Sequence, residues 1–365
     1  MKLQLTSPLD MHLHLRQDNM LKVVAPLSSK TFSGAIIMPN TLPPISTKEQ
    51  LLRYKEDILN ATKGDTFTPY MTLFFKNDYS REFLESIKDE ILSIKLYPAG
   101  ITTNSEGGVS TIDVESLRPT LEIMSDLGIV LNIHGETDGF VMDREAEFVP
   151  IYKALAKAFP KLKIVMEHIT TKASADALLE FENLYATITL HHLYITLDDV
   201  AGGMLQPHLF CKPIAKRPED REALLELALN ANPKVMFGSD SAPHPKSAKE
   251  APGCAAGIFT APIALQLLAQ LFDKHNKLEN LQAFVSNNAQ KIYAITPAKK
   301  IITLEKKSFK IPSSYGNVVP FMANEEIGFV IDNWKWIIEN GEWRIMDSGF
   351  KRMSHSCHSV LEMES

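Results

Sequence analysis

The sequence predicts a (β/α)₈ barrel with a small C-terminal appendage. Eight short apolar runs recur along the chain, and segments with helical periodicity separate them. Strands and helices that alternate at this spacing form a parallel sheet with right-handed crossovers, and eight such units close into a barrel. The apolar runs are residues 4–14, 34–40, 68–75, 91–97, 128–134, 163–169, 184–190 and 234–240.

The segments between these runs carry helix signals. Residues 46–62 open on a capping-box pattern, with Ser46 followed three residues later by Glu49. Residues 113–127 open on an aspartate and stop at Gly128. Further helices are expected at residues 148–159 and 217–230, and a proline follows each of them.

The pattern changes after residue 258. Two further helices are expected at residues 259–274 and 280–294, and short strands at 301–345, with Asn340-Gly341 as a hairpin turn. We therefore place the barrel domain at residues 1–300. We expect residues 301–365 to be an appendage that packs on the barrel and does not fold independently.

This C-terminal region holds all three tryptophans, Trp334, Trp336 and Trp343. Packing on the barrel and dimerisation are both open as their purpose. The polar tail from Lys351 carries His355 and His358, which we expect to be solvated.

The composition excludes several classes of protein. The 365 residues are 45% hydrophobic and 22% charged, as in an ordinary globular protein. A net charge of -6 without a basic run argues against nucleic acid as a partner. The sequence lacks an apolar stretch of membrane-spanning length and a signal-peptide pattern. Three cysteines without paired spacing, Cys211, Cys254 and Cys357, favour a reducing, cytoplasmic setting.

The first apolar run ends in His12-Leu13-His14-Leu15-Arg16. Residues two apart on a strand point the same way, so His12 and His14 project to one side, and Asp10 and Arg16 share their parity. Two neutral imidazoles at this spacing can share a metal ion. Two core histidines on an alternating strand explain the stretch equally well, so the rest of the chain must decide.

Other runs also end in polar residues, and in a barrel these ends converge on the catalytic face. Taken singly, each has a structural explanation. His134 could be a core histidine, Lys95 could extend out of the barrel mouth, Asp240 could cap a helix and Asn40 could be a turn residue. Jointly they favour a metal site, whose candidate ligands are His12, His14, Lys95, His134, His168 and Asp240.

Lys95 is the informative member of this set. Metal cations would repel a buried ammonium, so the lysine must lose its proton or be modified. Reaction of the neutral amine with CO₂ gives a carbamate, an anionic ligand that can bridge two metals. Two ions about 3.5–4 Å apart that share a water-derived ligand form a two-metal hydrolytic site.

These motifs resemble the amidohydrolase superfamily and, in detail, the single-domain bacterial dihydroorotase family. The resemblance runs from about residue 8 to 320. Its most specific parts are the Lys-Leu-Tyr-Pro-Ala stretch at 95–99 and the Ser-Asp-Ser-Ala-Pro-His stretch at 239–244. The other matching stretches are residues 10–16, 38–41, 100–104, 167–170 and 210–217.

The resemblance implies two zinc ions in each subunit. One would be held by His12, His14 and Asp240, the other by His134 and His168, and carboxylated Lys95 would bridge them. Asp240 would act as general base and then as general acid. The implied reaction interconverts N-carbamoyl-L-aspartate with dihydroorotate plus water, in pyrimidine biosynthesis.

The resemblance also implies a set of substrate contacts. Arg16 would grip the substrate carboxylate with two hydrogen bonds. Threonines of the loop at residues 100–110 would close over the substrate. The residues assigned to the substrate are His14, Arg16, Asn40, His134, Lys212, His244 and Ala256, and those assigned to the loop are Thr102 and Thr103.

Other functions stay open at this stage. A hydantoinase or dihydropyrimidinase would use a similar metal centre and need no carboxylate clamp. A non-catalytic barrel scaffold would be expected to lose ligands, and a one-metal deaminase-like site would leave Lys95 without a purpose. The resemblance further implies a homodimer.

Overall fold

A computed structural model describes residues 1–332, 334–339 and 342–347 of the chain. The predicted Asn340-Gly341 turn, Cys357 and the tail histidines lie outside these residues. Among the described helices, none combines the length and apolar character that a membrane crossing requires.

Eight parallel strands form the barrel, and neighbouring strands in the sheet are consecutive in the chain. Closure brings the first strand to the last, where the amide of Asp240 donates to the carbonyl of His12 at 2.8 Å. Leu13 and Ser241 form a parallel bridge across the same seam. The barrel strands are β2 (Leu9–Leu13), β3 (Gly34–Ile37), β4 (Thr68–Phe74), β5 (Ser93–Leu96), β6 (Val130–Ile133), β7 (Ile164–Met166), β8 (Leu184–Ile188) and β9 (Val235–Phe237).

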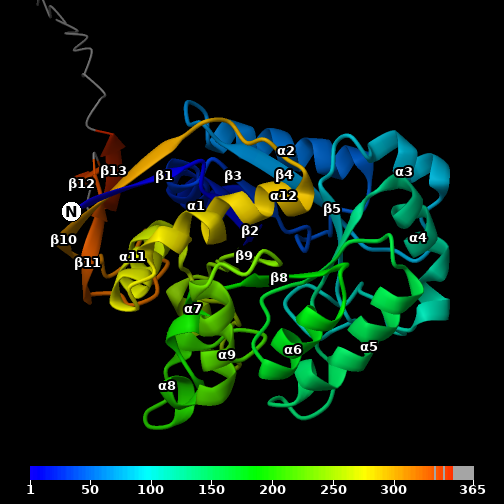
Figure 1. Cartoon of the computed structure of the whole chain (residues 1–365). Coiled ribbons are helices and arrows are strands. Elements are labelled where there is room, and N and C mark those ends of the chain that lie inside the picture. Colours follow the sequence, from blue (N-terminus) through cyan, green and yellow to red (C-terminus); the bar gives the residue numbers. More distant parts are fainter. Residues whose placement is uncertain (333, 340–341, 348–365) are drawn as a thin grey trace, which may run out of the picture.

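Helices surround these strands, as Figure 1 shows. The larger ones between the strands are α1 (Asp18–Thr31), α2 (Lys48–Ala61), α3 (Arg81–Ile87), α4 (Val114–Leu127), α5 (Arg144–Ala158), α6 (Lys172–Glu180) and α9 (Pro218–Leu229). Short elements follow β8, namely α7 (Leu190–Tyr194), α8 (Leu197–Ala201) and η1 (Pro207–Leu209). The predicted (β/α)₈ architecture is confirmed.

The segment after β9 is also helical. It contains α10 (Lys246–Lys249), η2 (Ala261–Ile263), α11 (Ala264–Lys274), η3 (Leu278–Asn280), the π-helical turn η4 (Ala283–Asn287) and α12 (Asn288–Tyr293). The predicted helix at 259–274 starts later, at Ala264, because a 3₁₀ turn containing Pro262 precedes it. The predicted helix at 280–294 is interrupted by the π-helical turn.

The first apolar run forms two strands, so the prediction of one strand at 4–14 is wrong. The left-handed backbone of Ser7 (φ 47°) and the proline after it end the first strand, β1 (Lys2–Thr6). This strand lies outside the barrel and pairs antiparallel with β10 (Ile301–Lys310), which also pairs with β11 (Glu326–Ile331). Figure 1 shows this small sheet beside the barrel.

Two further strands, β12 (Trp334–Glu339) and β13 (Glu342–Asp347), form an antiparallel pair in which Glu339 lies opposite Glu342. The division of the chain at residue 300 stays a prediction.

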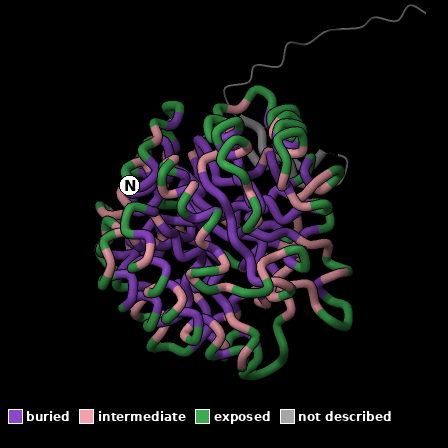
Figure 2. The backbone as a smooth tube through the Cα atoms, turned by 90° about the vertical axis from the view of Figure 1, so that its right-hand side faces the viewer, coloured by how far each residue is buried: buried purple, intermediate pink, exposed green. Residues whose placement is uncertain are grey.

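Buried backbone occupies the centre of the molecule and exposed backbone its periphery (Figure 2). One apolar cluster joins strand residues such as Met11 and Val165 to Ala289, Ile292 and Tyr293 of α12. The larger cluster packs the outer faces of the strands against the helices. Because apolar side chains fill the barrel, the polar side chains at the strand ends rest on a rigid base.

Candidate metal centre and active site

The six predicted metal ligands come together at the carboxyl ends of the barrel strands. His12 lies on β2 and Lys95 on β5, and the others lie within three residues of the ends of β2, β6, β7 and β9. All six side chains are buried. His168 and Asp240 have a left-handed backbone, with φ of 41° and 43°, which is uncommon for residues other than glycine. Such backbone turns the chain sharply and aims both side chains inward.

Two histidines face one carboxylate. His14 Nε2 lies 3.0 Å from Asp240 Oδ1, and His12 Nε2 lies 3.5 Å from the same oxygen. Burial lowers the pKa of both imidazoles, so each is neutral and keeps a lone pair. The ligand atoms of these three residues lie within 4.8 Å of one another. This spacing is suited to a single cation.

The other two histidines form an adjacent pair. His134 Nδ1 lies 3.2 Å from His168 Nε2, with 4.8 Å between the ring centroids. The ring of His168 also lies 4.9 Å from that of His12, so the two groups are contiguous. Two imidazole nitrogens this close need a proton or a cation between them, because their lone pairs repel. The pair therefore suits a second ion.

Lys95 is fully buried, and its Nζ has no hydrogen-bond partner among the described residues. Burial lowers the pKa of this amine to about 8, although the nearby carboxylates of Glu167 and Asp240 act in the opposite direction. An unpaired buried ammonium is costly. The orphaned amine beside four imidazoles therefore fits a modified, anionic ligand better than a free cation.

Two glutamates that were not predicted as site residues hold the imidazoles. Glu167 Oε2 lies 2.8 Å from His12 Nδ1, and Glu136 Oε2 lies 2.8 Å from His134 Nε2. Burial alone would raise the pKa of Glu167, but His12 and Lys95 lower it to about 2. A carboxylate on one ring nitrogen fixes the tautomer and leaves the other nitrogen free for a metal.

Asp10, which shares the parity of the two histidines, has a structural role. Its carboxylate accepts hydrogen bonds from the amide of Ser239 at 2.7 Å and from the Ser239 hydroxyl at 2.5 Å. These bonds join β2 to the end of β9. Asp10 therefore helps to close the barrel at the seam beneath the site.

Arg16 lies at the rim of the site beside His244. Its Nε donates to the carbonyl of Pro243, and its Nη2 lies 3.0 Å from His244 Nε2. The same His244 nitrogen lies 3.0 Å from the carbonyl of Ala256. A pocket of about 100 Å³ opens next to Arg16, and His14, Asn40 and Asn104 are among its lining residues. The pocket thus combines a fixed cation with amide groups.

The predicted loop at residues 100–110 contributes Asn104 to the lining of this pocket and is held beside it by hydrogen bonds. Asn40 Nδ2 donates to the carbonyl of Thr103 at 2.9 Å, and Asn104 Nδ2 donates to the carbonyl of Asn40 at 3.0 Å. Lys212 Nζ donates to the carbonyl of Ile101 at 2.9 Å. Lys212 thus contacts the loop through its side chain, and Thr103 contributes its carbonyl to these contacts.

A barrel that gathers histidines, an aspartate and an unpaired lysine at its strand ends defines a hydrolase of the amidohydrolase class. Residues 85–295 match the sequence profile of the amidohydrolase family.

The particular family follows from individual relatives. A dihydroorotase of Helicobacter hepaticus is 46% identical over 335 residues, which cover 90% of this chain and 97% of the relative. The crystal structure of a dihydroorotase from Campylobacter jejuni superimposes with a TM-score of 0.87 at 59% identity, covering 91% of this chain and 97% of that one.

A dihydroorotase of Saccharomyces cerevisiae, solved in complex with 5-fluoroorotic acid, has a TM-score of 0.85 at 34% identity, covering 90% of this chain and 98% of that one. The chain belongs to the dihydroorotase family, and it is an enzyme.

Proposed function

We propose that this enzyme interconverts N-carbamoyl-L-aspartate and (S)-dihydroorotate plus water, a step of pyrimidine biosynthesis. The observation that carries the proposal is the convergence of six ligand-type side chains on one barrel face, with the Arg16 guanidinium beside them. The substrate pair carries carboxylates and a cyclic amide, which match the fixed cation and the hydrolytic centre respectively.

The residues fit two metal ions. His12, His14 and Asp240 would hold one, and His134 and His168 the other, because neutral imidazole and carboxylate are ligands that zinc prefers. Two zinc ions bound there would lower the pKa of a water molecule and polarise the amide carbonyl of the substrate.

Lys95 would join the two ion sites as a carbamate. The neutral amine forms an N–C bond to CO₂ and releases one proton to solvent, which leaves an anionic group on the lysine. The unpartnered, buried Nζ supports this modification, since burial favours the neutral amine that the reaction requires.

Asp240 moves the proton during the reaction. It accepts a proton from the attacking water as the carbonyl carbon of the ring amide is attacked, and it donates that proton to the ring nitrogen as the C–N bond breaks. The reverse sequence closes the ring. Burial raises the pKa of this carboxyl, a direction that suits a group that must hold a proton transiently.

Other residues bind and orient the substrate. Arg16, Asn40 and His244 would hold its carboxylate, and a guanidinium suits this task because it offers two parallel donors. Lys212 and the backbone of Ala256 would contact the pyrimidine ring. Thr102 and Thr103 of the fastened loop would cover the bound substrate and exclude water.

A direct assay tests the proposal. Purified protein supplied with zinc and bicarbonate should hydrolyse dihydroorotate, as followed by loss of its ultraviolet absorbance, and should turn over hydantoin and dihydrouracil far more slowly. Absence of dihydroorotate turnover would reject the proposal. Arg16→Ala should raise KM for dihydroorotate at least 10-fold. An unchanged KM would favour a hydantoinase or dihydropyrimidinase, whose substrates need no carboxylate clamp.

The carbamate and the assembly have separate tests. The intact mass under native conditions should exceed the acid-treated mass by one CO₂, and Lys95→Ala should abolish this difference. We further propose a cytoplasmic homodimer, and light scattering after size exclusion would measure the subunit number.

A further inference from the structure

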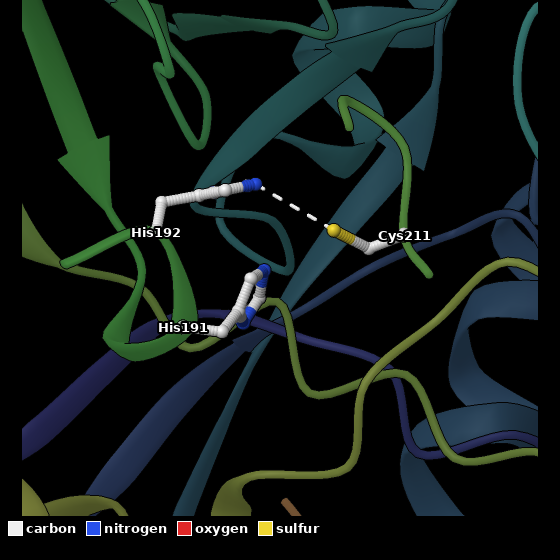
Figure 3. Close-up of side chains that lie close together, drawn as sticks. All are labelled: His191, His192 and Cys211. Atoms are coloured by element: carbon white, nitrogen blue, oxygen red, sulfur yellow. Dashed lines mark hydrogen bonds between the residues drawn. The ribbon is translucent and has the colours of Figure 1, made fainter. Parts of the chain in front are cut away.

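A second group of metal-ligand side chains lies outside the set described above. It consists of His191, His192 and Cys211, and we refer to it as the His-His-Cys cluster. The two histidines belong to the first turn of α7, and the cysteine lies between η1 and α9. The ligand atoms of the three residues lie within 4.8 Å of one another. Figure 3 shows the ring of His192 pointing at the sulfur of Cys211, with the ring of His191 beside them.

His191 is the unexplained member of the cluster. Its side chain is fully buried, and neither ring nitrogen has a hydrogen-bond partner among the described residues. Buried polar groups are normally paired, so an imidazole with two unpaired nitrogens calls for a ligand. Its ring centroid lies 4.3 Å from that of His192. Burial lowers the pKa of both rings, so both are neutral and can offer lone pairs.

His192 has a polar partner at Nδ1, the ring nitrogen that would not face the ion. Its Nδ1 lies 2.9 Å from the hydroxyl of Thr189, the residue that caps α7. A hydroxyl can accept from Nδ1–H as well as donate to Nδ1, so Thr189 can stabilise the tautomer that leaves Nε2 unprotonated. This Nε2 lies 3.5 Å from the Cys211 sulfur, the separation expected of two ligands on one tetrahedral ion.

We propose that the His-His-Cys cluster is a binding site for a thiophilic cation of the zinc type, separate from the catalytic ions. Two imidazoles and one thiolate select zinc-like ions over magnesium or calcium, which prefer oxygen. Binding converts the Cys211 thiol to a thiolate and releases one proton to solvent. Three protein ligands leave a fourth position for water.

The cluster lies next in the chain to a residue that contacts the loop at residues 100–110. His192 Nε2 and the Cys211 thiol both lie within hydrogen-bonding distance of the carbonyl of Pro213, at 3.1 Å and 3.2 Å. An ion would take both groups away from that carbonyl. The neighbouring Lys212 donates from its Nζ to the carbonyl of Ile101 in that loop.

Cobalt(II) provides a specific test, because a thiolate ligand produces a near-ultraviolet charge-transfer band and the catalytic ligands include no cysteine. Chelator-treated full-length protein is titrated with Co²⁺ alone. The C254S/C357S variant, in which Cys211 is the remaining cysteine, should develop the band, and C211S should not. Zn²⁺ added afterwards should displace the bound Co²⁺ and abolish the band, whereas Mg²⁺ should leave the band unchanged.

His191→Gln tests the imidazole ligand without touching the thiol. It should weaken the affinity for Co²⁺, read from the same band, at least 10-fold, as expected when one ligand of three is lost. Absence of the band from C254S/C357S at excess cobalt would overturn the proposal. An unchanged affinity in His191→Gln would overturn it as well, because the cysteine would then bind without the cluster.

Discussion

At the scale of single residues, the metal centre depends on carboxylates that do not face the substrate. Glu167 is fully buried beside His12, accepts a hydrogen bond from the Thr187 hydroxyl and is contacted by the amide of Asn132. Asn132 also donates to the Tyr293 hydroxyl of α12. A chain of contacts therefore runs from the His12 imidazole through Glu167 and Asn132 to α12. This chain fixes the orientation of the imidazole.

Glu167→Gln should weaken metal binding while the fold persists. The amide keeps the size of the side chain but removes the charge that fixes the His12 tautomer, and such partners typically contribute on the order of 10–100-fold in metal affinity or activity. Bound metal after dialysis and kcat/KM would be measured together. Glu122→Gln, at a position whose side chain is 59% exposed, is the matched control and should change neither. Full metal retention in Glu167→Gln would contradict this account.

The sequence predicted the candidate metal ligands, but it did not predict the residues that hold those ligands and the loop in place. His12, Lys95 and Asp240 could be predicted because polar residues at the ends of apolar runs converge in a parallel barrel. Glu136 lies in a loop, where no periodicity indicates which way a side chain points. The contact between Lys212 and Ile101 joins positions 111 residues apart, so only the folded chain reveals it.

At the scale of elements, the loop at residues 100–110 is held by a few polar contacts from outside itself. Lys212 reaches its carbonyl at Ile101 in a 2.9 Å hydrogen bond, whereas Lys76 reaches Gly107 only at 3.5 Å. The first contact has ordinary hydrogen-bond geometry, and the second lies at the outer limit. Two lysines outside the loop thus contact it with hydrogen bonds of unequal geometry, and their effects can be compared.

Lys212→Met should free the loop, and Lys76→Met should not. Loss of one hydrogen bond worth roughly 1 kcal/mol shifts the opening equilibrium about 5-fold. Hydrogen exchange of amides at residues 100–110 would report the opening directly, and KM for dihydroorotate would be expected to rise with it. Equal exchange rates in the two variants would show that Lys212 does not fasten the loop.

At the start of α2, the cap predicted from the sequence differs from the cap in the structure. The pattern placed the cap at Ser46, paired with Glu49, and this placement is wrong by one residue. In the structure Thr47 is the cap, with its hydroxyl accepting from the amide of Gln50, while the Gln50 side chain accepts from the amide of Thr47. Both registers satisfy the capping-box pattern, so the sequence pattern alone does not distinguish them.

Thr47→Ala should therefore destabilise the protein by about 1 kcal/mol, the usual cost of losing a cap hydroxyl. Ser46→Ala should cost only a few tenths, because the Ser46 hydroxyl makes just a 3.4 Å contact with Gln50. The urea unfolding midpoints of both variants would distinguish a cap at Thr47 from a cap at Ser46. A larger loss of unfolding free energy in Ser46→Ala than in Thr47→Ala would support the cap at Ser46 that the sequence predicted.

Element types were easier to predict than element ends. Strands buried on both faces read as continuous apolar runs, which is why all eight barrel strands fall within predicted segments. Their ends were overestimated because the polar site residues continue the runs past the last paired residue. Asp113 and Gly128 fixed α4 correctly, since the first caps the helix and the second adopts φ 69°.

At the scale of the whole molecule, the first strand of the chain pairs with a strand that follows the barrel. The strand β1 pairs with β10 across about 300 residues of sequence, with Leu5 opposite Ile302 and Leu3 opposite Leu304. The side chain of Leu5 is fully buried in the main apolar cluster, whereas Leu3 is only partly buried against it. The small sheet therefore links the start of the chain to the strands after the barrel, and Leu5 is the residue of β1 that is fully buried.

Leu5→Ala should cost about 2–5 kcal/mol of unfolding free energy, because it leaves a cavity where the sheet meets the barrel. Leu3→Ala, in the same strand and with the same change of side chain, should cost clearly less, because solvent already reaches that position. Urea unfolding would give both values, and hydrogen exchange at Ile302 and Leu304 would show whether β10 loosens with β1. Equal costs in the two variants would mean that the strand contributes through backbone pairing alone, and that the sheet is not anchored in the core.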